Sequence, residues 1–324
     1  MDIVEQLSAE FKLKKEYSQN IVNLLDEGCT IPFIARYRKE MHGSCDDQIL
    51  REFADRLTYL RNLQKRKDEV ENSIKEQEKW SDELEIALKN AKTLTEVEDI
   101  YRPYKPKRKT RASVAIAKGL EPLADLIMEQ KVFLEELNSN AESFVNEEKE
   151  VKSVEEAIAG AKDIIAERIS DDAELRKTLR QTIVDFAQIH TNLLEKEGSE
   201  VYEMYADHTE PVKNIPSHRV LAINRGEKEE CLKVEIVLDE QVALNEIEKS
   251  YIIENSSLKS LMQEIIADSY KRLLFPSLEN ECRTNLTDVA NEQAIKMFEV
   301  NLKPLLLQAP LKNNIIMGFD PGYR

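Results

Sequence analysis

Hydrophobic residues recur every three or four positions along most of the chain, which is the spacing of one face of an α-helix. The longest such run begins after the capping residue Asp46 and continues to about Lys79 without a glycine or proline. Its apolar positions are Leu50, Phe53, Leu57, Leu60 and Leu63. A helix of this length spans on the order of 50 Å, more than one compact domain, so we expect its second half to bridge two lobes.

A helical hairpin is expected before this long helix. Its first helix stops at Gly28, and Thr30 can cap the second, TIPFIARYRKE. We predict that Phe33, Ile34 and Tyr37 form the buried side of the second helix. The pair resembles a helix-turn-helix, in which the cations of the second helix would face the major groove of DNA, although hairpins of this spacing are more often plain packing units. These cations are Arg36, Arg38 and Lys39.

The rest of the chain predicts a mainly α fold: a multi-helix bundle with the hairpin, the long bridging helix and a small mixed α/β insert. In the insert, TNLL and CLKVEIVLD are strand-like, and IPSHRVLAINRGE predicts a short helix closed by Gly226. Near the end, the apolar segment Ile315–Met317 and an Asp-Pro-Gly turn predict a strand without a neighbour. We expect a helical region at 1–110, a bundle at 111–189, the insert at 190–240, long helices at 241–312, and the first strand of a truncated domain at 313–324.

Charge and cysteine usage restrict where the protein acts and what it contacts. Charged residues make up 33% of the chain and the formal net charge is -16, so the chain as a whole repels nucleic acid and any polyanion contact must be local. The 4 cysteines form no CxxC pair, which indicates reduced thiols and a cytoplasmic protein. No leader-like start and no run of roughly 20 apolar residues occurs, so we expect no membrane partner.

One window departs from this acidic background. Tyr101 to Arg111, YRPYKPKRKTR, holds six basic residues and no acidic ones, so the rest of the chain carries -16 minus 6, or -22. Lysine and arginine can neutralise phosphates, and tyrosine can stack on an unpaired base. The candidate nucleic-acid ligands are Tyr101, Tyr104, Lys105, Lys107, Arg108, Lys109 and Arg111. The alternative is that this loop pairs with an acidic helix of its own chain.

The sequence contains no complete catalytic or metal-binding motif. Cys29, His42 and Cys45 lack a recognisable zinc spacing and a fourth ligand, and no phosphate-cradling glycine loop occurs. Asp320 follows the terminal strand, where a two-metal nuclease places one ligand, but such chemistry needs several carboxylates. We therefore expect no catalytic residue, no metal or other cofactor, and no enzymatic activity.

Several segments together resemble one family. The segments are IPFIARYRKE, VEDIYRPYKPKRKTRA, AKGLEPLAD, AGAKDIIAERISDDAELR, IPSHRVLAINRGE and IMGFDPGYR. In order and without large gaps, they are similar to the amino-terminal half of bacterial Tex transcription accessory proteins. The resemblance implies a YqgF-type RNase H-like domain that begins near Ile315, followed by helix-hairpin-helix domains and an OB-type RNA-binding domain beyond Arg324. We therefore expect the chain to be truncated within that first strand.

The resemblance also implies nucleic-acid binding, a role around transcription, and correspondence to a eukaryotic elongation factor that associates with RNA polymerase. We expect a non-enzymatic scaffold that binds RNA or DNA weakly, with a local phosphate contact made by Lys105 to Arg111. The alternative is a protein-interaction module that docks on RNA polymerase or the ribosome without touching nucleic acid. A metal nuclease ranks last, because its other carboxylates would lie beyond this sequence.

Overall fold

The computed structural model describes residues 2–106, 109–309, 312, 315 and 317–320. It divides into two compact units, an amino-terminal unit formed by Met1–Arg108 with Asp171–Ala173, and a carboxyl-terminal unit formed by Lys109–Ser170 with Glu174–Arg324. The described residues are mainly helical with one small antiparallel sheet, which confirms the predicted fold class.

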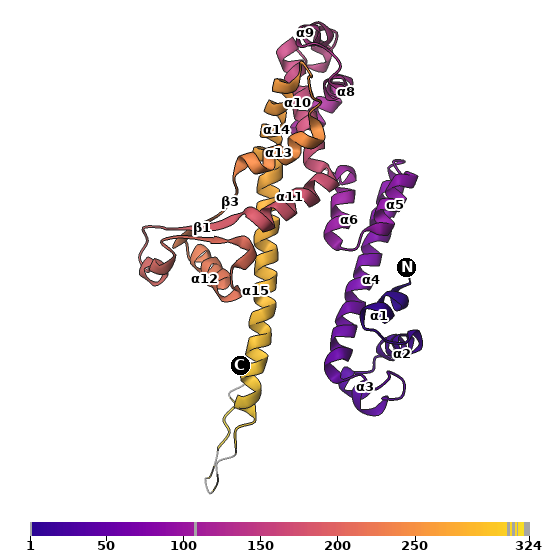
Figure 1. Ribbon diagram of the computed structural model, residues 1–324, viewed down its shortest axis with the longest axis vertical. Helices are drawn as coiled ribbons and strands as arrows, with labels where there is room; N and C mark the ends of the chain where they lie inside the picture. Colours follow the sequence, from indigo (N-terminus) through magenta and orange to yellow (C-terminus); the bar gives the residue numbers. More distant parts are fainter. Residues whose placement is uncertain (1, 107–108, 310–311, 313–314, 316, 321–324) are drawn as a thin grey trace. The chain divides into compact units, whose positions relative to one another are not determined.

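The amino-terminal unit is built on one long helix, α4, with shorter helices along it (Figure 1). Its elements are α1 (Ile3–Glu10), α2 (Lys15–Asp26), α3 (Ile31–Tyr37), α4 (Asp47–Glu76), α5 (Asp82–Asn90), α6 (Leu94–Tyr101) and the 3₁₀ turn η1 (Arg102–Tyr104). The Asp46 side chain accepts a hydrogen bond from the Ile49 backbone N–H and so caps α4. Helix α4 ends three residues before the predicted Lys79.

Two separate hydrophobic clusters lie along α4. The first packs α1, α2 and α3 against Leu50, Phe53 and Leu57 in its amino-terminal half. The second packs α5 and α6 against Val70 and Ile74 in its carboxyl-terminal half. The second half of α4, which we expected to bridge two lobes, therefore packs one face against a small core of its own.

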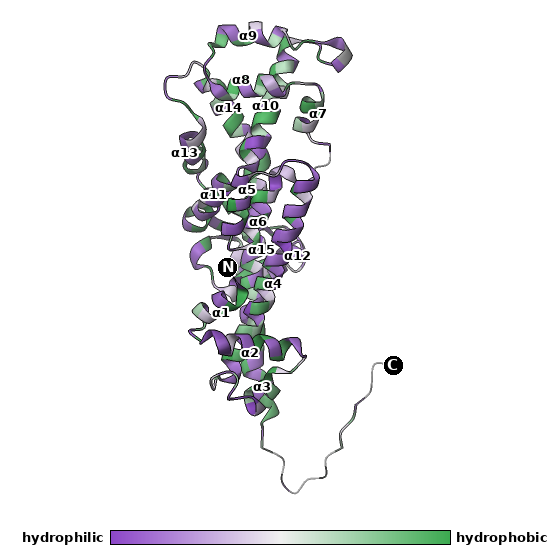
Figure 2. Cartoon of the chain, turned by 90° about the vertical axis from the view of Figure 1, so that its right-hand side faces the viewer, coloured by the Kyte–Doolittle hydropathy of each residue, from purple (hydrophilic) through white to green (hydrophobic). Residues whose placement is uncertain are grey.

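The carboxyl-terminal unit is a helical assembly with one inserted sheet. Its first elements are α7 (Arg111–Ala117), α8 (Glu121–Glu129), α9 (Leu134–Glu142), η2 (Glu147–Lys149), α10 (Val154–Asp171) and α11 (Ala173–Phe186). Then follow β1 (Gln188–Leu193), η3 (Ser199–Tyr205), β2 (Asp207–Pro211), η4 (Val212–Asn214), α12 (Ser217–Lys228), β3 (Leu232–Val237), α13 (Glu240–Tyr251), α14 (Lys259–Ser269), the π-helical turn η5 (Tyr270–Leu274) and α15 (Phe275–Leu306). Figure 2 shows hydrophobic stretches on α10 and α14, which contribute to one continuous core.

The predicted insert is a three-stranded antiparallel sheet in the order β2-β1-β3. In the central strand, Ile189 pairs with Glu210 on one side and with Ile236 on the other. The strands predicted around TNLL and CLKVEIVLD are confirmed, whereas β2 was not predicted. Gly226 does not close α12 but lies inside it and is buried. A Cβ added at this position would lie 2.6 Å from Leu232 Cδ1, so no larger residue fits without a shift of its neighbours. This glycine allows a close approach of helix and strand.

The carboxyl-terminal segment forms no strand in its described part. Ile315, Met317 and Phe319 are strongly exposed and unpaired with any strand, and the remainder of the predicted strand lies outside the described residues. A single apolar strand without a neighbour has no ladder to join, which explains this difference from the prediction. Among the described helices, none combines the length and the apolar character that crossing a bilayer requires.

Candidate nucleic-acid interface

The two tyrosines of the basic window attach it to α4. The Tyr101 side chain is only 8% exposed, and its hydroxyl lies 2.9 Å from the Ser73 hydroxyl. The Arg66 guanidinium lies 5.4 Å from the centre of the Tyr101 ring and covers it. The Tyr104 carbonyl accepts a hydrogen bond of 3.0 Å from Gln77 Nε2. Tyr101 is therefore a core residue with no accessible ring face for a base, and only the half-buried Tyr104 offers any ring surface.

The cations that follow, which we call the basic loop (residues 105–111), are less restrained. Lys105, Lys109 and Arg111 are exposed, and in the described part of the chain none of them forms an ion pair. Lys107 and Arg108 lie outside the described residues. The basic loop therefore presents three exposed cations to solvent, of which Arg111 is also attracted by the carboxylates of Asp163 and Asp268.

The alternative of self-pairing holds at the edges of the basic window. Arg102, just before the basic loop, forms an ion pair of 3.2 Å with Asp171. The Thr110 hydroxyl donates to Glu167 at 2.9 Å. A hydrogen bond from Arg272 lowers the pKa of Asp268, and the more distant charge of Arg111 adds to that effect. The chain's own carboxylates thus contact the window at Arg102 and Thr110, whereas Lys105 and Lys109 are exposed.

The cations of α3 form a second group. Arg36 and Lys39 are exposed, and Arg38 lies with its guanidinium 5.3 Å from the centre of the Phe33 ring. None of these three cations forms an ion pair with another described residue. Elsewhere in the same unit the arginines are paired with carboxylates: Arg51 with Asp47, Arg56 with Glu10, Arg61 with Asp26 and Arg66 with Glu98.

The prediction for the buried face of α3 is wrong in two of three positions. Ile34 is fully buried in the first cluster, whereas Phe33 is 37% exposed and Tyr37 is 63% exposed. The helix is only seven residues long, and the side that packs against the first cluster is formed by Ile31, Ile34 and Ala35, so Phe33 and Tyr37 lie outside it. Sequence reasoning predicted that these rings are buried because they are apolar and lie at helical spacing.

The α3 cations and the start of the basic loop, both in the amino-terminal unit, are attached to different parts of α4; in Figure 1, α3 and α6 lie toward opposite ends of that helix. Ile34 of α3 belongs to the cluster that contains Phe53, whereas Tyr101 bonds to Ser73. Twenty residues of helix separate Phe53 from Ser73, which corresponds to about 30 Å along α4. A single small ligand cannot contact both groups, so they are two sites rather than one face.

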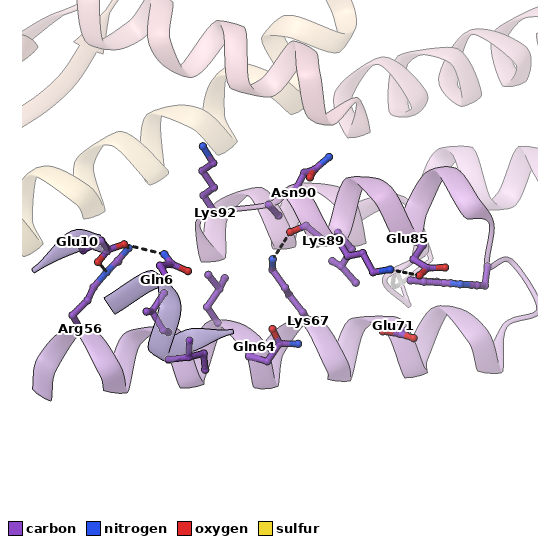
Figure 3. A pocket seen from close by; sticks show the side chains of 16 residues that line it. Gln6, Glu10, Arg56, Gln64, Lys67, Glu71, Glu85, Lys89, Asn90 and Lys92 are labelled. Atoms are coloured by element: carbon purple, nitrogen blue, oxygen red, sulfur yellow. Dashed lines mark hydrogen bonds and ion pairs between the residues drawn. The ribbon is translucent and has the colours of Figure 1, made fainter. Parts of the chain in front are cut away.

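A groove of ≈ 820 Å³ runs along α4 between α1 and α5 (Figure 3). Its apolar floor comes from Leu60, Leu63, Leu88, Ala91 and Trp80. The charges on its rim mostly satisfy one another: Arg56 pairs with Glu10, and Lys89 pairs with Glu85. The Lys67 ammonium donates to the Lys89 carbonyl at 3.1 Å, and partial burial lowers the pKa of Lys67. Such a groove suits an amphipathic peptide better than a polyanion.

The residues considered for zinc have structural roles in the amino-terminal unit. His42 is fully buried and its Nε2 lies 3.1 Å from the Ile34 carbonyl oxygen. The Cys45 thiol donates to the His42 carbonyl at 2.9 Å, and the half-buried Cys29 packs against the first cluster. Over the described residues, no three histidine, cysteine, aspartate or glutamate side chains are grouped so that they could hold a metal ion.

Two family models match the sequence. The model described as Tex-like protein N-terminal domain matches residues 1–75, and the model described as Tex central region-like matches residues 135–298. The first match covers the α1–α3 helices and most of α4, and the second covers α9 to most of α15.

Curated relatives match along nearly the whole chain. The uncharacterized protein YdcI of Bacillus subtilis is 44% identical over 324 residues, which is 99% of this chain and 45% of the relative. The transcriptional accessory protein Tex of Neisseria gonorrhoeae is 38% identical over 332 residues, 100% of this chain and 43% of the relative. Human S1 RNA-binding domain-containing protein 1 is 29% identical over 340 residues, 100% of this chain and 34% of the relative.

The chain spans less than half the length of these relatives. The resemblance noted in the sequence is confirmed, since the central-region model alone matches residues 135–298, about half of the chain. On these matches the chain belongs to the Tex family.

Proposed function

We propose that this chain is the non-enzymatic helical scaffold of a transcription accessory protein, and that its basic loop makes a weak phosphate contact with RNA or DNA. The relatives' names support an association with transcription and with RNA binding, because they include a transcriptional accessory protein and an S1 RNA-binding domain-containing protein. The proposal concerns only the part of such a protein that this sequence spans.

One observation carries the proposal. In a chain of net charge -16, the exposed cations Lys105, Lys109 and Arg111 stand within seven residues of one another with no acidic residue between them, and none of them forms an ion pair within the described residues. Other exposed lysines in the described part of the chain, such as Lys228 and Lys259, are also without an ion pair, so the close spacing of the cations is what distinguishes the basic loop. Leaving cations unpaired among so many carboxylates gives up Coulomb attraction, which is recovered when phosphate is bound. Because the rest of the chain repels polyanions, binding is expected to be weak and steeply dependent on salt.

The test is a salt titration of binding. Fluorescence anisotropy of labelled single-stranded and duplex oligonucleotides is measured between low and moderate salt for the wild-type chain and for the triple variant Lys107→Ala, Arg108→Ala, Lys109→Ala. Each lost phosphate contact reduces the slope of log K against log salt by about 0.7 for a single strand, so three contacts reduce it by about 2. A matched control removes three exposed lysines elsewhere, Lys228, Lys259 and Lys296. If both variants bind like the wild type, the loop assignment is wrong.

A second candidate function is a protein-interaction module, and the groove on α4 favours it. The apolar floor and internally balanced rim suit an amphipathic helix of a partner such as RNA polymerase or the ribosome. A pull-down with polymerase subunits separates the candidates: capture that is lost on Gln64→Arg, which places a bulky cation on an exposed position of the groove, but kept in the basic-loop variant supports docking, and the reverse pattern supports nucleic-acid contact.

A further inference from the structure

Helix α3 exposes two aromatic rings that the fold could have covered. Phe33 and Tyr37 are one helical turn apart, and their ring centres lie 5.3 Å apart at an angle of 44°. Tyr37 is 63% exposed although a hydrophobic cluster lies directly beneath α3. Burying a tyrosine ring would add to the stability of the fold, so the exposed Tyr37 ring leaves an apolar surface that a ligand can cover.

Three cations surround these rings. The Arg38 guanidinium lies over Phe33, and its Nη1 donates to the Tyr37 carbonyl at 3.3 Å, which holds the cation beside the aromatic pair. Arg36 and Lys39 are exposed and lie within two residues of Tyr37 in the sequence. We call the two rings and three cations the α3 patch.

The acidic residues near the α3 patch do not cancel it. Asp26, at the end of the preceding helix, is engaged by Arg61 through two hydrogen bonds of 2.7 and 2.8 Å. That hydrogen bonding lowers the pKa of Asp26 and fixes its charge toward α4. Glu27 and Glu40 are exposed, which leaves two carboxylates against three cations. The patch keeps a positive balance in a chain whose net charge is -16.

We propose that the α3 patch binds an unpaired nucleic-acid strand by stacking a base on Tyr37, with Arg36, Arg38 and Lys39 neutralising the flanking phosphates. An exposed ring gains little from a duplex, whose base faces are already stacked on one another, whereas every unpaired base has a free face. Stacking of this kind contributes about 1–3 kcal/mol per base and tolerates any sequence. The patch therefore discriminates single strand from duplex, which a set of cations alone cannot do.

This inference rests on the proposed nucleic-acid-binding function, but it uses other residues, about 30 Å along α4 from Tyr101. It also differs from the helix-turn-helix reading of α3, in which cations enter the major groove of a duplex. The two sites therefore fail separately: the basic-loop variant alters the salt slope for both forms of nucleic acid, and a variant of the α3 patch alters the preference between them.

The experiment compares three ligands of equal length at low salt by fluorescence anisotropy: a labelled oligothymidylate, the same backbone with abasic sites, and a duplex. The variants are Tyr37→Ala, Tyr37→Phe and, as a matched control, Phe186→Ala, which removes a ring that is 67% exposed in the other unit. The fluorescence of Trp80 and the far-ultraviolet circular dichroism confirm that each variant is folded.

We expect the wild-type chain to prefer the base-bearing strand over the abasic strand by about 5- to 100-fold, the range that corresponds to one stacked base. Tyr37→Ala abolishes this preference and leaves duplex binding unchanged, Tyr37→Phe retains it, and Phe186→Ala has no effect. The proposal is overturned if the wild type does not discriminate the two strands, or if Tyr37→Ala keeps the discrimination. The proposal is also overturned if Tyr37→Ala leaves strand binding unchanged but abolishes the binding of a protein partner in a pull-down. That result would assign the patch to protein docking.

Discussion

Ile74 tests whether the second half of α4 carries a core of its own. The side chain is 0% exposed and belongs to the cluster with Val70, Leu88 and Val97. Replacement by alanine removes three carbon atoms, whose transfer out of water contributes about 2.4 kcal/mol at about 0.8 kcal/mol each. The residual cavity adds to this, so we expect a loss of about 2–5 kcal/mol in the free energy of unfolding.

The chain contains its own probe for this measurement. The sequence contains a single tryptophan, Trp80, and it packs against the same cluster. Its fluorescence therefore reports the unfolding of this part of the amino-terminal unit. With a urea dependence of about 1–3 kcal/mol per molar, Ile74→Ala should lower the midpoint by at least about 0.7 M. Ile74→Val, with an expected cost of about 0.5–1.5 kcal/mol, keeps the test readable if the alanine variant is unfolded in water.

The control variant is Ile86→Ala on α5, because that side chain is the same residue type but 61% exposed. It should change the unfolding free energy by less than about 0.5 kcal/mol. Equal midpoints for Ile74→Ala, Ile86→Ala and the wild type would refute the reasoning, since α4 would then be the bare strut that its charged sequence suggested.

Three further predictions concern the rest of the chain. Gly226→Ala should destabilise the carboxyl-terminal unit by about 1–2 kcal/mol in thermal unfolding, because its Cβ would lie 2.6 Å from Leu232 Cδ1 and the gain in helix propensity offsets only part of the overpacking. Burial raises the pKa of Cys282 to about 11, so its modification by a thiol reagent at pH 8 should accelerate by roughly 100-fold in urea, and equal rates would contradict the burial. The hydrogen bond from Arg56 lowers the pKa of Glu10, so this pair stabilises the fold above the ordinary glutamate range and the stabilisation is lost as the pH falls below it. Arg56→Met should therefore reduce stability at pH 7 and make stability less dependent on pH below about 5, as followed by urea midpoints.

Sequence reasoning worked where periodicity and capping agreed. The cap at Asp46, the long helix after it and the alternating strand near Leu232 all form as expected, because each is specified by residues close in the chain. Reasoning failed at Gly226, which looked like a helix stop but serves packing between α12 and β3. It also missed β2, whose alternation is weak and whose pairing partner lies earlier in the chain.

The candidate nucleic-acid interface, too, could be predicted only in part from local sequence. Composition located the basic window, but only coordinates separate Tyr101, which is buried, from Tyr37, which is exposed. The sequence predicted the opposite arrangement, with Tyr37 on the buried side of its helix and Tyr101 free to stack on a base, although both are tyrosines in short helices beside arginines. What decides between them is whether another helix lies over the ring, and that depends on tertiary packing.

The separation of the cationic groups bears on how a scaffold of this kind works. The α3 cations and Lys105, at the start of the basic loop, are anchored about 30 Å apart along α4 and cannot form a single strong polyanion site, so each contact is weak alone. A rigid helix nevertheless fixes their spacing, so a strand long enough to reach both α3 and the start of the basic loop would bind them as linked sites. Such linkage favours long, unpaired strands over short or paired ones, whereas protein docking at the α4 groove requires neither group. The dependence of affinity on strand length therefore separates the nucleic-acid scaffold from the docking module on the same chain.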